Sequence, residues 1–229
     1  MPQWFDPHFH VLPPAQREVW AALSPAADLG FVLYGGTAVA LQLGHRRSLD
    51  FDFFSFAPLS KAGLIAALPI LATAELLQEA PNTFVASAVM PSGPVKLSFF
   101  GRIRFGRLNE PLRSRDGVLL AASLEDLLAT KLKAMLDRAE AKDYVDVAAM
   151  LRAGASLPRG ISAARAMFNA EPRTILTAIG YFGDGDVASL PAGDRQMLLA
   201  ARDAVRDLPE VTVTPGSLAG AAGGDSDGP

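Results

Sequence analysis

The sequence of 229 residues contains no cysteine. Disulfide bonds and thiolate metal sites are therefore excluded, and any bound metal must be held by oxygen ligands or by the three histidines. Carboxylate and other oxygen ligands favour magnesium or manganese. A metal site built from oxygen ligands would therefore be expected to hold Mg²⁺ or Mn²⁺.

Long hydrophobic runs are also missing. The longest apolar stretch, residues 64–72, is interrupted by Pro69 and falls well short of the roughly 20 residues that cross a bilayer. The N-terminus lacks a basic segment followed by an apolar run, so no secretion signal is predicted. We expect a cytoplasmic protein with no membrane partner.

A strong charge of either sign is absent, because the formal net charge is only −3. No global basic field is present that would draw the chain onto nucleic acid. Arginines do cluster locally, which is more typical of a solvated surface than of an RNA-binding groove, and both interpretations stay open. The cluster consists of Arg102, Arg104, Arg107, Arg113 and Arg115.

Hydrophobic residues make up half of the chain, enough for one substantial core or two small ones. Strand and helix patterns both occur in residues 1–120, which are expected to form an α/β core, and helical patterns dominate residues 121–213, which are expected to form a helical portion. Residues 214–229 are rich in glycine, alanine and serine without an apolar period, which predicts a disordered tail.

The first part of the chain contains a strand, a glycine turn and a helix in succession. An apolar run at residues 31–34 ends at Gly35 and Gly36, and residues 37–43 read as a short helix that ends at Gly44. Paired glycines between a strand and a helix let backbone N–H groups approach a phosphate, and the helix start favours an anion. Alone, such a pair is usually only a tight turn.

Residues 48–54 alternate between apolar and polar side chains, which predicts a half-buried strand. Leu49, Phe51 and Phe53 fall on one face, and Asp50 and Asp52 fall on the other with Ser48. Carboxylates two residues apart on a strand lie roughly 6.5–7 Å apart and can share a metal. Alternating acids are common on surface strands, so this pattern gains weight only from the glycine turn before it.

The hydrophobic period and the turn and capping residues predict the remaining elements. Strands are expected at residues 73–78, 83–89 and 95–100, and a helix at residues 59–68. Ser123 is a plausible N-cap, with Asp126 at the third helical position, and helices follow from there.

Four segments together resemble AbiEii/AbiGii-type toxins, within the DNA polymerase β-like nucleotidyltransferase superfamily. The similarity covers roughly residues 31–151. It is carried by Tyr34-Gly35-Gly36-Thr37-Ala38, by the run Arg46-Arg47-Ser48-Leu49-Asp50-Phe51-Asp52-Phe53-Phe54, by residues 126–134, and by Arg138 with Lys142-Asp143-Tyr144-Val145-Asp146.

The resemblance implies an α+β fold with a small mixed sheet, flanking helices and a C-terminal helical portion. It implies transfer of a nucleoside monophosphate from a nucleoside triphosphate to an acceptor, with release of pyrophosphate. Acceptors in the family include the 3′ end of tRNA, and a cognate antitoxin neutralises the toxin. The nucleotide-binding residues are expected to be Gly35, Gly36, Thr37, Arg46, Ser48 and Lys131, and the metal ligands Asp50 and Asp52.

Lys131 interrupts an apolar stripe formed with Leu128 and Met135. A lysine there needs a partner or a route to water, and opposite a triphosphate its ammonium would neutralise phosphate charge. Replacement by methionine is then expected to weaken nucleotide binding and leave stability intact. By resemblance Asp143 works at the site, orienting Lys131 or the acceptor, and Asp146 is a weaker candidate. The expected catalytic residues are therefore Asp50, Asp52, Lys131 and Asp143.

One position departs from the superfamily pattern. Two-metal enzymes of this kind present a third carboxylate from a later strand, and Ser98 stands at the matching place in residues 95–100. Nucleotide binding is still expected, and catalysis becomes an open question. Two alternatives stay open: an antibiotic-type adenylyltransferase acting on a small molecule, and a non-catalytic nucleotide-binding module.

Overall fold

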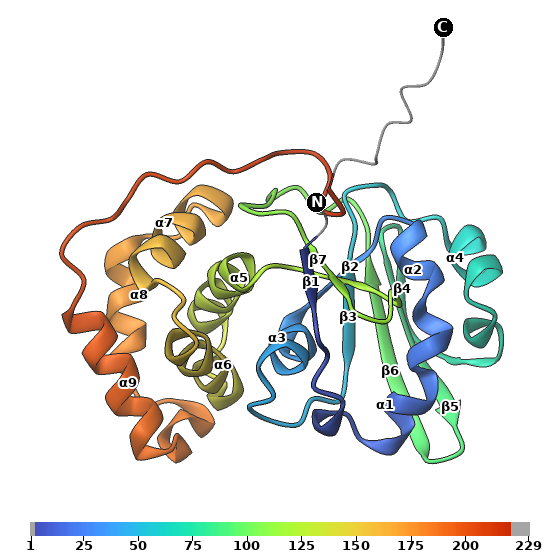
Figure 1. The fold of residues 1–229 in the computed structure, drawn as a ribbon, viewed down its shortest axis with the longest axis horizontal. Coiled ribbons are helices and arrows are strands. Elements are labelled where there is room, and N and C mark those ends of the chain that lie inside the picture. Colours follow the sequence, from blue (N-terminus) through green and yellow to red (C-terminus); the bar gives the residue numbers. More distant parts are fainter. Residues whose placement is uncertain (1–2, 221–229) are drawn as a thin grey trace, which may run out of the picture.

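A computed structural model describes residues 3–220 of the chain. Over these residues the chain forms an eight-stranded mixed sheet with helices on both faces (Figure 1). The strand order is β1-β7-β8-β2-β3-β6-β5-β4. The strands are β1 (Gln3–Phe5), β2 (Val32–Tyr34), β3 (Phe51–Phe54), β4 (Glu75–Ala80), β5 (Thr83–Met90), β6 (Gly93–Phe100), β7 (Leu112–Ser114) and β8 (Leu120–Ala121).

The helices separate into two groups around the sheet (Figure 1). Helices α1, α2 and α4 lie on one side, whereas α3 and the C-terminal helices lie on the other. Their bounds are α1 (Pro14–Val19), α2 (Pro25–Asp28), α3 (Gly35–Leu43), α4 (Lys61–Ala67), α5 (Leu124–Asp137), α6 (Ala141–Arg152), α7 (Leu157–Phe168), α8 (Pro172–Ile179) and α9 (Ala192–Asp203). Short 3-10 helices are η1 (Phe9–Val11), η2 (Trp20–Leu23), η3 (Pro69–Thr73) and η4 (Gly185–Ser189).

Aromatic packing fixes which face of β3 is buried. The Phe53 ring stacks on Phe99 with centroids 5.1 Å apart, and Phe51 lies 6.4 Å from Trp20 on the side of the sheet that α1 covers. Because side chains alternate along a strand, Asp52 must point to the opposite face. β3 pairs in parallel with β6, and this register places Asp52 beside Ser98.

The strand predicted at residues 48–54 is shorter than expected. β3 begins only at Phe51, and Leu49, expected on the buried face, is 60% exposed. The preceding segment is held by individual hydrogen bonds instead of a strand ladder, including one from Gln16 Nε2 to the Leu49 carbonyl at 2.8 Å. The alternating sequence pattern therefore begins three residues before the backbone starts to pair with its neighbouring strands.

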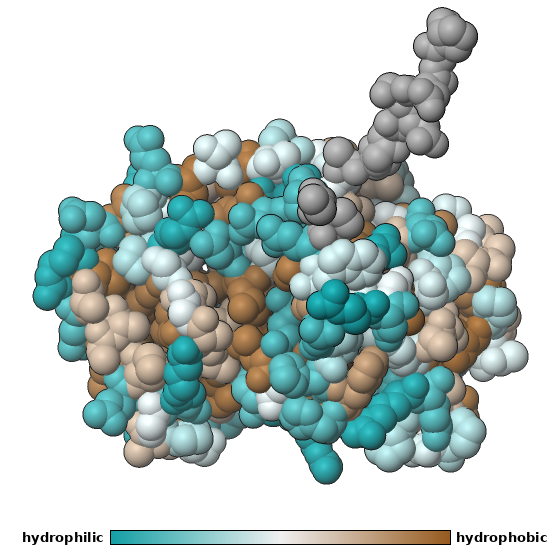
Figure 2. Space-filling model, in the orientation of Figure 1, coloured by the Kyte–Doolittle hydropathy of each residue, from teal (hydrophilic) through white to brown (hydrophobic). Residues whose placement is uncertain are grey.

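The C-terminal helical portion begins as its capping signal predicts. The Ser123 hydroxyl accepts a hydrogen bond from the Asp126 amide at 3.1 Å, and α5 starts at Leu124, directly after the last strand. In the space-filling view, apolar residues gather between these helices and the sheet, over α5 (Figure 2). Among residues 3–220 no helix has the length and hydrophobicity needed to cross a membrane.

The tail predicted to be disordered from Thr214 needs correction. Residues 205–220 return from α9 towards the sheet as an extended segment (Figure 1). Thr214 and Arg107 exchange backbone hydrogen bonds of 2.8 and 3.1 Å, and Leu218 is almost completely buried. Backbone pairing and one buried leucine order this part despite its simple composition, whereas residues 221–229 lie outside the described range.

Candidate active site

The glycine turn at the start of α3 lies directly against Asp52. Gly35 has φ of +71°, and a Cβ added there would lie 2.8 Å from Asp52 Oδ2, so a side chain would be both strained and in collision. At Gly36 an added Cβ would overlap the Arg46 guanidinium. Tyr34, the N-cap, makes no side-chain capping hydrogen bond, so the helix start keeps its capacity for an anion.

Asp52 is a partly buried carboxylate that forms no ion pair within residues 3–220. Burial raises its pKa, the hydroxyl of Ser98 counteracts this by hydrogen bonding to the carboxylate, and the charge of Asp50 raises the pKa further. The ionised form of Asp52 therefore destabilises the folded protein, and a bound cation would reduce this effect.

Asp50 precedes β3 and lies at the rim of the same region. Its side chain is 49% exposed, and its Oδ2 is 3.8 Å from Nζ of Lys96. Lys96 shares a face of β6 with Ser98, so Asp50 and Asp52 lie on the same face of the sheet, as the sequence predicted.

These two carboxylates fit a magnesium or manganese ion that takes its other ligands from phosphate and water. Within the described residues, no group of three or more histidine, aspartate or glutamate side chains could hold a metal by itself. The raised pKa of Asp52 is the feature that favours a cation, because the buried carboxylate lacks charge compensation.

The two predicted hydroxyl ligands, Thr37 and Ser48, have a different immediate role. Both are buried, their hydroxyl oxygens are 2.7 Å apart, and the Thr37 hydroxyl also donates to the Asp50 carbonyl. They therefore anchor the segment that carries Asp50 to the start of α3.

Lys131 lies in a buried ion-pair network between α5 and α6. Its side chain is 5% exposed, and its Nζ is 2.6 Å from Asp143 Oδ1 and 2.7 Å from Asp146 Oδ2. Both carboxylates are completely buried. The lysine thus has two partners instead of a route to water.

Arg46, which was expected to bind the nucleotide, belongs to the same network. Its Nε and Nη2 donate to the two carboxylate oxygens of Asp146 at 2.6 and 2.8 Å, and His45 Nε2 lies 2.7 Å from the same residue. Arg46 precedes β3, which begins only at Phe51. Asp146, the weaker candidate, is thus the centre of the network.

The pKa of Asp146 reflects these contacts. Burial acts to raise it, but hydrogen bonds from His45 and Arg46 and the positive charge of Lys131 outweigh burial and hold the pKa well below its ordinary value. Asp146 is therefore ionised, and the surrounding cations compensate its charge.

A pocket of about 370 Å³ opens beside these groups. Three of the predicted site residues line it: Gly35, Asp52 and Lys131. The sequence analysis assigned no role to Arg138, whose half-exposed side chain lines the pocket and donates from Nε to Asp143 at 2.9 Å. The other lining residues are Tyr34, Phe54, Phe100, Phe105, Thr130, Lys133, Ala134, Asp137 and Phe168.

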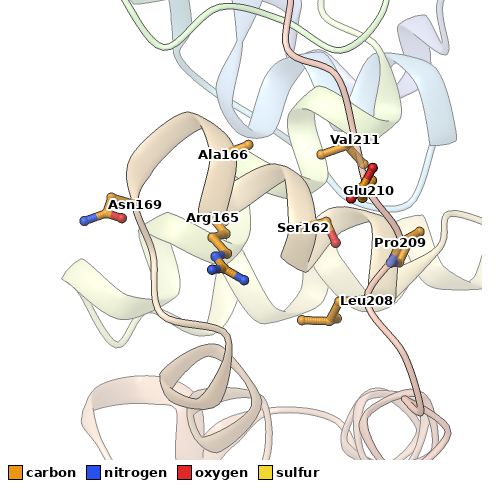
Figure 3. A pocket seen from close by; sticks show the side chains of 8 residues that line it. All are labelled: Ser162, Arg165, Ala166, Asn169, Leu208, Pro209, Glu210 and Val211. Carbon is orange, nitrogen blue, oxygen red and sulfur yellow. The ribbon is translucent and has the colours of Figure 1, made fainter.

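A second pocket, of about 410 Å³, lies between α7 and the extended C-terminal segment (Figure 3). Its charged lining residues are Arg165 and Glu210, and none of the predicted site residues line it. The arginine cluster also resolves into separate contacts, since Arg107 is buried and pairs with Glu110, and Arg115 pairs with Asp6. The pocket lined by Gly35, Asp52 and Lys131 is therefore the candidate active site.

Three comparisons with known proteins bear on the family and the fold of this chain. The family model described as "Nucleotidyl transferase AbiEii toxin, Type IV TA system" matches residues 20–212. An uncharacterized protein of Aquifex aeolicus (strain VF5) is 31% identical over 143 residues, which cover 60% of this chain and 67% of that protein. The crystal structure of an antigenic nucleotidyltransferase-like protein from Paracoccidioides brasiliensis superimposes with a TM-score of 0.52 at 18% identity, covering 84% of this chain and 95% of that one. The last similarity supports the fold.

Proposed function

The chain belongs to the AbiEii nucleotidyltransferase toxin family, and we propose that it transfers a nucleoside monophosphate from a nucleoside triphosphate to an acceptor. The observation that carries this proposal is the contact between the Gly35 turn and the Asp52 carboxylate at the edge of a pocket lined by Lys131 and Arg138. In this proposal the turn receives the phosphates, the carboxylate binds a metal ion, and the two cations neutralise charge, as phosphoryl chemistry requires.

In this proposal each residue has a defined task. Gly35 and Gly36 present the start of α3 to the phosphates, and Asp50 and Asp52 hold Mg²⁺ or Mn²⁺, which would neutralise developing phosphate charge. The acceptor hydroxyl attacks the α-phosphorus and releases its proton to water. A new P–O bond forms, and the bond between the α-phosphorus and the oxygen that bridges to the β-phosphate breaks to release pyrophosphate.

Asp143 serves as a positioning residue in this scheme. It is completely buried and contacts both Lys131 and Arg138, at 2.6 and 2.9 Å. Its carboxylate therefore holds the two cationic side chains in fixed positions beside the pocket. We therefore assign Asp143 the task of aiming Lys131 and Arg138 at the pocket.

The acceptor and the biological role are inferred from the family. The family description names a toxin of a type IV toxin–antitoxin system, so we propose a toxin that modifies RNA, with the 3′ end of tRNA as acceptor and a cognate antitoxin as its partner. The buried Ser98 beside Asp52 leaves a second metal ion with few anionic ligands, so we expect slow transfer.

The test is incubation of the protein with total RNA, Mg²⁺ and each α-labelled nucleoside triphosphate in turn. Label should enter RNA with the wild type and with Asp28→Asn, an exposed control, but not with Asp52→Asn. Label in small molecules instead of RNA would identify an adenylyltransferase of the antibiotic type, and nucleotide binding without any transfer would identify a binding module.

A further inference from the structure

Aromatic side chains continue the polar face of β3 and β6 into the pocket. Phe54 follows Asp52 by two residues, and Phe100 follows Ser98 by two residues. Because residues two apart on a strand share a face, the same strip of sheet is first polar and then aromatic. Phe54 and Phe100 are paired in register, with ring centroids 5.4 Å apart in an edge-to-face arrangement.

Further rings enclose this strip. Phe105, between β6 and β7, lies 6.1 Å from Phe54 and 5.0 Å from Phe168 of α7. Tyr34 stacks on Phe54 with centroids 5.0 Å apart and an angle of 18°. Phe54, Phe100, Phe105 and Phe168 all line the pocket and are all partly exposed to solvent. Apolar ring surface thus remains available to a planar ligand.

The lining of the pocket also carries charged groups. Lys131, Lys133 and Arg138 supply three cations against the two carboxylates of Asp52 and Asp137, and the Gly35 turn lies in the same lining. A ligand that fills about 370 Å³ and contacts both the rings and the cations needs a flat apolar end and an anionic end. A nucleotide has both parts, joined by a ribose.

We propose that Phe54, Phe100 and Phe105 form a stacking platform for the nucleobase, with the phosphates directed towards Gly35 and Asp52. This inference rests on the proposed function and adds the subsite that holds the base. Stacking uses the π-face that every base has, so the platform should strengthen the binding of all four nucleoside triphosphates.

The test separates base from phosphate by comparing ATP with inorganic tripolyphosphate, each titrated calorimetrically with Mg²⁺. Phe100→Leu keeps the apolar bulk and removes the flat ring. It should weaken ATP binding by about 5- to 100-fold, the range of one lost base stack, and leave tripolyphosphate binding unchanged. Phe100→Trp should retain ATP binding, because it keeps a flat ring.

Phe9→Leu is the matched control. Phe9 is also partly exposed and lies edge-on to Trp20 at 5.0 Å, on the other side of the sheet. The Phe9→Leu variant should bind ATP and tripolyphosphate as the wild type does. Phe105→Leu tests the platform from another segment and should behave like Phe100→Leu.

Four outcomes would overturn the inference. Unchanged ATP affinity in Phe100→Leu and Phe105→Leu would remove the platform, and equal loss of both ligands would show that the rings only support the phosphate end. A wild type that binds tripolyphosphate as tightly as ATP would also refute stacking while the phosphate site stands. A wild type that binds neither ligand would refute the proposed function, and this inference with it.

Discussion

Two pairs of aspartates lie where the sheet meets the C-terminal helices, and their surroundings are opposite. Asp143 and Asp146 on α6 are completely buried, and each contacts Lys131 and one arginine within 3 Å. Asp50 and Asp52 near β3 have one distant lysine, 3.8 Å from Asp50. We call the first pair the closed pair and the second the open pair.

The difference shows that burial alone does not tell whether a carboxylate can receive a ligand. The pKa of Asp146 is lowered because its cations outweigh burial, whereas the pKa of Asp52 is raised because burial outweighs its hydrogen bond from Ser98. The closed pair has its charge compensated and holds α5, α6 and Arg46 together. The open pair has only partial charge compensation, from Lys96 at 3.8 Å, and a metal ion would complete it.

Breaking the closed pair should have the largest effect on stability. Lys131→Met would leave Asp143 and Asp146 buried without their shared cation, at a cost of about 3–5 kcal/mol in the free energy of unfolding. This reverses the expectation drawn from the apolar stripe, which assumed no partner for the lysine. Urea denaturation measures it, with Lys133→Met as a control, because Lys133 pairs only with the exposed Asp137. Equal stability of the two variants would contradict the closed network.

Neutralising Asp52 of the open pair should change the stability of the apo protein in the opposite direction. Asp52→Asn removes a buried charge that lacks compensation, so the apo protein should gain stability on the order of 1 kcal/mol while losing magnesium-dependent nucleotide binding. Asp28→Asn, at an exposed position, should change neither property. Thermal denaturation with and without Mg²⁺ and nucleotide measures both effects, and a loss of stability would show that Asp52 is structurally paired.

The two pairs should also differ in their response to pH. A raised pKa makes ionisation of Asp52 destabilising, so the advantage of Asp52→Asn is present at pH 7 and shrinks as pH falls towards 3.8, the ordinary aspartate value. A lowered pKa makes ionised Asp146 stabilising above 3.8, and this contribution is lost as pH falls towards the lowered value. Asp146→Asn should therefore show a deficit that shrinks in acid. Denaturation of Asp52→Asn at pH 7 and pH 4, and of Asp146→Asn at pH 4 and about pH 2.5, each against the wild type, tests these opposite signs.

The smallest expected effect concerns metal binding at the open pair. Ser98 is buried beside Asp52 in register, and Ser98→Asp would add a third anionic ligand there. Transfer should then require a few-fold lower magnesium concentration, with little change in nucleotide affinity. A magnesium titration of the transfer rate measures it against Ser98→Asn, a neutral control. An identical magnesium requirement in all three proteins would show that Ser98 does not limit metal binding.

Local patterns were sufficient to predict the turn and the strands around the open pair. The strand, glycine turn and helix at residues 32–43 follow from an apolar run, two glycines and the αL cap at Gly44. The period-two pattern around Asp52 placed Asp52 and Ser98 on the face opposite Phe51 and Phe53. These predictions depend on neighbours within one element, which sequence periodicity reports directly.

The closed pair and the pocket were decided by tertiary structure. Arg46 and Asp146 are 100 residues apart, and Phe105 meets Phe168 from another element, so no local period links them. The same holds for residues 214–220, which a composition rich in small residues assigned to a tail and which backbone pairing with Arg107 orders. The sequence by itself determined which side chains share an element face. Which charges meet a partner depends on packing between elements, because ion pairing is set by distance in space and not along the chain.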